Sequence, residues 1–202
     1  MRHFSLPITC LLLAYGLHSP SAEADPVVGG SVDVTFTATV ADTTCVINVV
    51  GGSGDGKNQT VVIGDSNGEV PIEAVINGDS AATASFSLQA SECPAAGTPN
   101  FFTTIQADSD LTAANMLLNE AEGPTAAQGL GISLSRADSP DTPLPLNQKL
   151  SYGDLGWQVL IKDNFMQSVE ARMVAKIAPT AAASSARAGS VQASAVFHFD
   201  YN

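Results

Sequence analysis

The sequence predicts one domain folded as an all-β sandwich, and three observations predict it. Apolar and polar residues alternate with a period of two in several short runs, residues typical of turns separate these runs, and two cysteines lie far apart in the chain. Short strands joined by Gly, Pro and Asp turns are typical of two packed β-sheets. The 202 residues contain no internal repeat or linker, so the length fits a single domain.

Alternating runs place the expected strands along the chain. The first strand covers residues 30–40, where every second residue is apolar: Val32, Val34, Phe36, Ala38 and Val40. Further strands are predicted at residues 45–50, 60–63, 84–90, 130–134, 157–162 and 169–177. The last run carries Val191, Ala193, Ala195, Phe197, Phe199 and Tyr201 on one parity. A short helix fits residues 109–122, although its pattern is weak.

The first 24 residues have the pattern of an export signal. Arg2 and His3 precede a mostly apolar run over residues 4–17, and Ala22 and Ala24 supply the small residues that a signal peptidase needs. A transmembrane anchor is the alternative, but a run of about 14 residues is too short to cross roughly 30 Å of hydrocarbon. We therefore expect residues 1–24 to be a cleaved signal peptide.

Cleavage also simplifies the cysteine content, because Cys10 leaves with the signal. Cys45 and Cys93 then form an even pair in an oxidising compartment. A disulfide between them closes a loop of 48 residues, which is worth about 4 kcal/mol on the chain-entropy model. A metal-binding or catalytic thiol pair is the alternative, and it is disfavoured because no histidine lies near either cysteine in the sequence.

Charge and histidine content disfavour several classes of function. The formal net charge is -12, and an acidic surface repels phosphate, so nucleic acid and anionic membranes are not expected partners. Loss of His3 and His18 with the signal leaves His198, which the alternation places on the outward side of the last strand. No Gly-x-Ser-x-Gly elbow accompanies it, so we expect no catalytic residues and no enzyme activity.

The acidic residues lie among residues that form turns, as in segments 65–69 and 138–141. A calcium loop needs oxygen ligands at alternating positions before a glycine, and Asp65 alone does not supply them. Turn formation is therefore the favoured interpretation of both segments, and no metal or other cofactor is predicted.

Both end strands of the mature chain are unusually one-sided in their apolar pattern. One interpretation pairs them in one sheet as ordinary terminal strands. The other is that one terminus completes the sandwich of a neighbouring molecule, because an added strand gains main-chain hydrogen bonds and fills pockets with every second side chain. The residues by themselves leave both interpretations open.

Four motifs in order give the chain a resemblance to a known family. Gly189 is the fourteenth residue from the end, Tyr201 is penultimate, and the alternating run lies between them. Residues 30–45, 86–93 and 129–134 resemble, in turn, the family's N-terminal extension, the strand with its second cysteine and a further strand. Over its whole mature length the sequence resembles chaperone–usher fimbrial subunits of the type 1 pilus family.

The resemblance implies an incomplete immunoglobulin-like sandwich that lacks its final strand. Residues 25–42 would form an N-terminal donor-strand extension, and residues 43–202 the pilin domain. The strand at the C-terminus would border an apolar groove that a periplasmic chaperone fills first. The implied groove and chaperone-binding residues are Gly189, Val191, Ala193, Ala195, Phe197, Phe199, Tyr201 and Asn202. The chaperone would hold the main-chain carboxylate of Asn202.

The resemblance also implies how neighbouring subunits meet. At the outer-membrane usher, the extension of the next subunit would replace the chaperone strand. The implied donor residues of this chain are Val32, Val34, Phe36, Ala38 and Val40. The chain departs from the family at Ala38, seven residues before Cys45, where the family usually has glycine. The implied route is export through the periplasm to the cell surface, as part of a fimbrium.

Two functions of different classes are carried forward from the sequence. The leading expectation is a structural pilus subunit that polymerises by donor-strand exchange and supports cell adhesion. The alternative is a minor tip or adaptor subunit with a face that binds a host glycan. A secreted β-sandwich enzyme is disfavoured by the single histidine of the mature chain.

Overall fold

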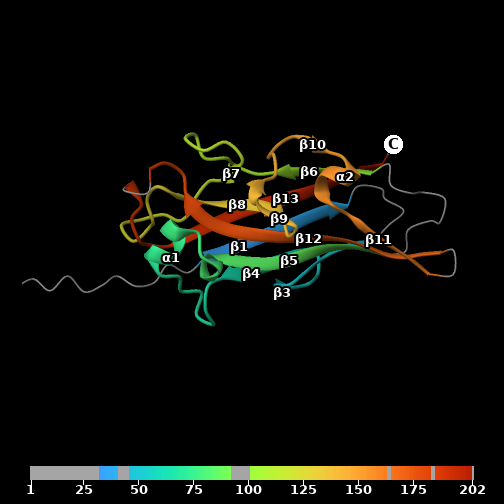
Figure 1. Cartoon of the computed structure of the whole chain (residues 1–202), viewed down its shortest axis with the longest axis horizontal. Helices are drawn as coiled ribbons and strands as arrows, with labels where there is room; N and C mark the ends of the chain where they lie inside the picture. Colours follow the sequence, from blue (N-terminus) through green and yellow to red (C-terminus); the bar gives the residue numbers. More distant parts are fainter. Residues whose placement is uncertain (1–31, 41–45, 92–100, 163–164, 183–184, 202) are drawn as a thin grey trace, which may run out of the picture.

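The computed structural model describes residues 32–40, 46–91, 101–162, 165–182 and 185–201. These segments form two β-sheets, and the long strands run along the long axis of the molecule (Figure 1). The expected signal peptide and both mature cysteines, Cys45 and Cys93, lie outside the described residues. The predicted all-β, immunoglobulin-like sandwich is confirmed.

The first sheet contains both ends of the described chain. Its strands, in spatial order, are β10 (Lys149–Leu150), β6 (Phe101–Gln106), β13 (Val191–Tyr201), β1 (Val32–Val40), β4 (Asn58–Ile63) and β3 (Ser53–Gly54). The second sheet has the order β2 (Val46–Val50), β5 (Thr83–Ser91), β12 (Phe165–Pro179), β8 (Leu130–Arg136) and β7 (Met116–Leu117). Two further strands extend it, since β11 (Gln158–Lys162) pairs with β12 and β9 (Ser139–Pro143) with β8.

Alternating side chains from both sheets fill the space between them. Ile47, Leu88, Leu134 and Met173 come from the second sheet and are at most 1% exposed, as are Ile105 and Phe197 from the first. Every strand predicted from alternation is a strand in the structure, and strands such as β2 and β13 present one apolar face to this shared core.

The helix expected over residues 109–122 is wrong. That segment contains turns and the short strand β7, whose Met116 and Leu117 pair with β8. Two local features compete with a helix: the Asp110 carboxylate accepts a hydrogen bond from the Thr112 backbone N–H at 2.7 Å, and Asn115 has a φ of 66°. The described helices are instead α1 (Ile72–Asn77), α2 (Tyr152–Leu155) and a 3₁₀ turn, η1 (Ser80–Ala82).

The short helix α2 owes its position to the residue that precedes it. The Ser151 backbone N–H donates to the Asp154 carboxylate at 2.8 Å, and the Ser151 hydroxyl oxygen accepts from the Asp154 backbone N–H at 3.3 Å. This reciprocal capping box satisfies backbone groups that a helix start leaves unpaired. Leu155, at its end, is fully buried, so the cap also positions a core side chain.

We expect Ser151→Ala to lower the free energy of unfolding by about 1 kcal/mol, because it removes the side-chain half of this cap. Urea unfolding measures the loss, and Ser66→Ala in an exposed turn is the control with little change expected.

Hydrogen bonds from the Ser151 hydroxyl, and then from its backbone N–H, hold the pKa of Asp154 below its usual value. The stabilisation from the charged form is therefore present at neutral pH and is lost as the pH falls through the folded-state pKa. An equal loss in Ser151→Ala at neutral and at strongly acidic pH would contradict this assignment.

Candidate functional site

The candidate site is the strip of the first sheet between β13 and β4, which we call the groove. In this structure β1 occupies it. β1 is parallel to β13, from the pair Val32–Val191 to the pair Val40–Phe199, and antiparallel to β4, from Val32–Ile63 to Thr37–Asn58. Without β1, the facing edges of β13 and β4 would have unpaired backbone N–H and C=O groups.

The position of β1 bears directly on the two interpretations of the terminal strands. Both strands pair in one sheet of the same chain, as the first interpretation states. The direction of β1 follows from its covalent link, since its last residue, Val40, must lie within about 20 Å of Val46, where β2 begins. A strand supplied by another molecule has no such constraint, and a role for residues 32–40 in a neighbour stays a prediction.

β13 forms one wall of the groove, and its predicted alternation is confirmed. Its inward residues are at most 2% exposed: Val191, Ala193, Ala195, Phe197 and Phe199. The Phe197 ring meets Phe86 of β5 edge-on, with centroids 6.3 Å apart, and Phe199 meets Trp157 at 6.4 Å. The β13 backbone continues to Tyr201, which pairs with Phe101, and Asn202 lies outside the described residues.

Two polar side chains hold the first half of β13 on the edge away from the groove. Asn119 accepts from the Gln192 backbone N–H at 3.0 Å and donates to the Ser190 carbonyl at 3.1 Å. Glu120 accepts from the Ser194 backbone N–H at 3.2 Å and from its hydroxyl at 2.9 Å. This support does not depend on the strand in the groove. The sequence reasoning missed both residues, because contacts of this kind leave no periodic signal.

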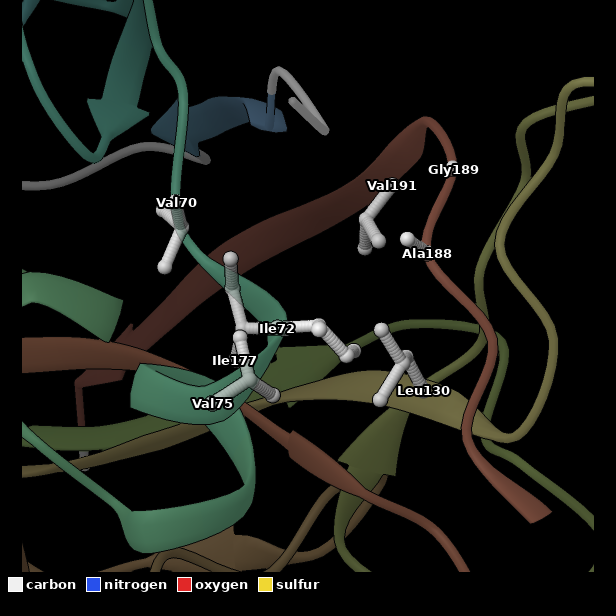
Figure 2. A pocket seen from close by; sticks show the side chains of 8 residues that line it. All are labelled: Val70, Ile72, Val75, Leu130, Ile177, Ala188, Gly189 and Val191. Carbon is white, nitrogen blue, oxygen red and sulfur yellow. The ribbon is translucent and has the colours of Figure 1, made fainter. Parts of the chain in front are cut away.

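An apolar pocket lies at the end of the groove where Val191 pairs with the first residue of β1. The space free of protein atoms there is about 280 Å³, a figure that includes open solvent at the mouth of the pocket. Figure 2 shows its walls, which come from α1 and the segment before it, from β8 and β12, and from the start of β13. The lining residues are Val70, Ile72, Val75, Leu130, Ile177, Ala188, Gly189 and Val191. The pocket therefore offers further apolar surface to an extended strand in the groove.

The chemistry of the groove is main-chain pairing and apolar contact. Within the described segments, no group of three or more His, Cys, Asp or Glu side chains is arranged to hold a metal ion. His198 lies on the outer face of β13, where its Nε2 is 2.6 Å from Gln106 Oε1. Asp65 accepts hydrogen bonds from the backbone N–H groups of Glu69 and Asn67, which lower its pKa, so the turn interpretation of segment 65–69 is confirmed.

A family model described as "Fimbrial protein" matches residues 34–202, which include both walls of the groove. The chain belongs to the fimbrial protein family. The family resemblance seen in the sequence is thereby confirmed, and membership indicates a subunit of a surface pilus. No curated protein matches the chain.

Two solved structures are similar to this fimbrial protein. The P pilus rod subunit PapA matches with a TM-score of 0.48 and 12% identity, over 80% of this chain and 94% of that chain. The CupB6 tip adhesin from Pseudomonas aeruginosa matches with a TM-score of 0.34 and 14% identity, over 57% of this chain and 33% of that chain.

Two sequence predictions, the signal peptide and the disulfide, concern residues of the fimbrial chain that lie outside the described segments. The β2–β5 register pairs Val46 with Ser91, which are the described residues nearest in sequence to Cys45 and Cys93. The disulfide itself stays a prediction. Of the helices described, none is long and apolar enough to span a bilayer.

Proposed function

We propose that the protein is a structural pilus subunit that polymerises by donor-strand exchange. In this proposal the groove accepts the N-terminal strand of a neighbouring subunit, and residues 32–40 of this chain fill the groove of the next one. The observation that supports it most is the place of β1, a strand from the extreme N-terminal part of the described chain that lies between β13 and β4. Such a strand is joined to the rest of the sheet by backbone hydrogen bonds, which any strand of suitable pattern can supply.

Strand direction supports an exchange of occupants. The β1–β13 pair is parallel, whereas the other pairs recorded between described strands are antiparallel. Parallel pairing is slightly less stable per residue than antiparallel pairing. A neighbour's strand can enter antiparallel to β13 and extend into the apolar pocket beside Val191 and Gly189.

The remaining parts of the proposal concern assembly. An unoccupied groove exposes apolar surface and two sheet edges, which favours aggregation, so a periplasmic chaperone would cover it until an outer-membrane usher brings the next subunit. Export would need the signal peptide at residues 1–24, and the Cys45–Cys93 disulfide would stabilise the exported domain. The donor residues are Val32, Val34, Phe36, Ala38 and Val40, as the family resemblance implies.

Deletion of residues 25–40 from the mature chain tests the donor role. We expect the truncated subunit to be held by its chaperone and not to enter fibres, because it has a groove but no strand to give. Val34→Asp should act in the same way, since Val34 pairs with the buried residues Val61 and Ala193. Thr35→Asp is the matched control, because Thr35 pairs with the half-buried Thr60 and Ser194. Fibres that contain the truncated chain in their shafts would refute the donor role.

A further inference from the structure

Gln59 is a polar residue on the inward face of β4. It is 6% exposed and follows the same parity as Val61 and Ile63, which are at most 1% exposed. Its side-chain oxygen is buried and accepts no hydrogen bond within the part of the chain that the structure describes. A buried carbonyl oxygen without a donor weakens a folded state, so such a group calls for an explanation.

The β1–β4 register places Gln59 opposite Phe36, inside the groove. Residues of the same parity along the N-terminal strand are Gly30, Val32, Val34, Phe36, Ala38 and Val40, and none has a side-chain hydrogen-bond donor. A shift of the strand by two residues, or a reversal of its direction with the same face inward, therefore brings no donor to Gln59. The lack of a donor for the Gln59 side-chain oxygen therefore follows from the residue types on this face of the strand and does not depend on one register.

We propose that Gln59 is a specificity residue of the groove. It favours an incoming strand that carries a side-chain hydrogen-bond donor, a hydroxyl or an amide, at the inward position beside it. The partner it selects is the strand of a different subunit, because this chain's own strand lacks such a group. This inference rests on the proposed strand-acceptor function and deepens it, since it assigns the subunit to a junction between unlike subunits.

Unfolding of the full mature chain provides the first test. Gln59→Met keeps the length of the side chain and removes the buried oxygen, so we expect it to raise the folding equilibrium constant about tenfold while β1 fills the groove. Gln89→Met is the matched control, because Gln89 is exposed on β5, and its change should stay within about twofold.

A double-mutant cycle then tests the pairing itself. Phe36→Gln removes apolar contact, but it places an amide donor beside Gln59. We expect its cost to be at least about fivefold smaller in the Gln59 chain than in the Gln59→Met chain. Equal costs in the two backgrounds, or a Gln59→Met chain less stable than the parent, would overturn the inference.

A peptide competition covers the case in which a variant does not fold. The full chain is refolded with a synthetic peptide of residues 32–40 that has either Phe or Gln at position 36. We expect the preference for the Phe peptide over the Gln peptide to be at least about fivefold smaller in the parent chain than in the Gln59→Met chain. The same preference in both chains overturns the specificity role but keeps the groove as a strand acceptor. Failure to capture either peptide, together with unchanged stability of Val34→Asp, overturns the proposed function and this inference with it.

Discussion

Phe197→Ala is expected to lower the free energy of unfolding by about 3–5 kcal/mol. The Phe197 side chain is fully buried in the middle of β13, and its ring meets Phe86 across the sandwich with centroids 6.3 Å apart. Removal of the ring leaves a cavity between the two sheets, and β-strands held by ladders on both sides cannot close it without loss of register. The same ring lies beside position 38 of β1, so the groove wall loses part of its apolar surface as well.

Urea unfolding of the mature chain measures this effect, with the slope of the transition as a check that the unfolded state is unchanged. Val62→Ala is a control from the same sheet, because Val62 is 46% exposed on the outer face of β4, and its loss should stay below about 1 kcal/mol. A loss for Phe197→Ala as small as that of the control would mean that the β13 face is not part of the core.

The strands that the sequence predicts well are those whose buried parity is wholly apolar. β13 and β12 belong to this class, since residues such as Phe197 and Met173 repeat at every second position. β6 was missed because Thr103 shares its inward parity with Ile105, and both are at most 1% exposed. A buried threonine breaks the apolar signal without breaking the strand, so periodicity alone does not reveal it.

The strands that form the site were predictable, but the choice between the two interpretations of the terminal strands was not. Alternation identifies which residues share a face within β1 and within β13. It carries no information about which strand each one pairs with, or about whether the pair is parallel or antiparallel. The parallel β1–β13 pairing arises from the short link between Val40 and Val46, which is a geometric constraint. Gln59 escaped notice for a related reason: the predicted strand at residues 60–63 begins after it, where the β-branched run starts.

The second large effect on stability is expected at Gly189, which the family resemblance implies to be one of the groove residues. A Cβ atom built there would lie 2.5 Å from the Ala127 backbone nitrogen and closer still to the Thr125 carbonyl oxygen. Both atoms are fixed, because Ser190 N–H donates to Thr125 at 2.8 Å and Ala127 N–H donates to Ser190 at 2.9 Å. Gly189→Ala should therefore cost about 3 kcal/mol, the upper range for overpacking.

Gly153→Ala is the control for this substitution, because an added Cβ in α2 would meet no atom closer than Ser151 Oγ at 4.0 Å. It should leave the urea transition unchanged or raise it slightly, since alanine favours a helix over glycine. The clash at Gly189 lies within the subunit, between its own backbone segments and beside the apolar pocket. A fibre defect in Gly189→Ala is therefore expected together with a loss of subunit stability. A fibre defect with an unchanged urea transition would show instead that a partner protein contacts Gly189 directly.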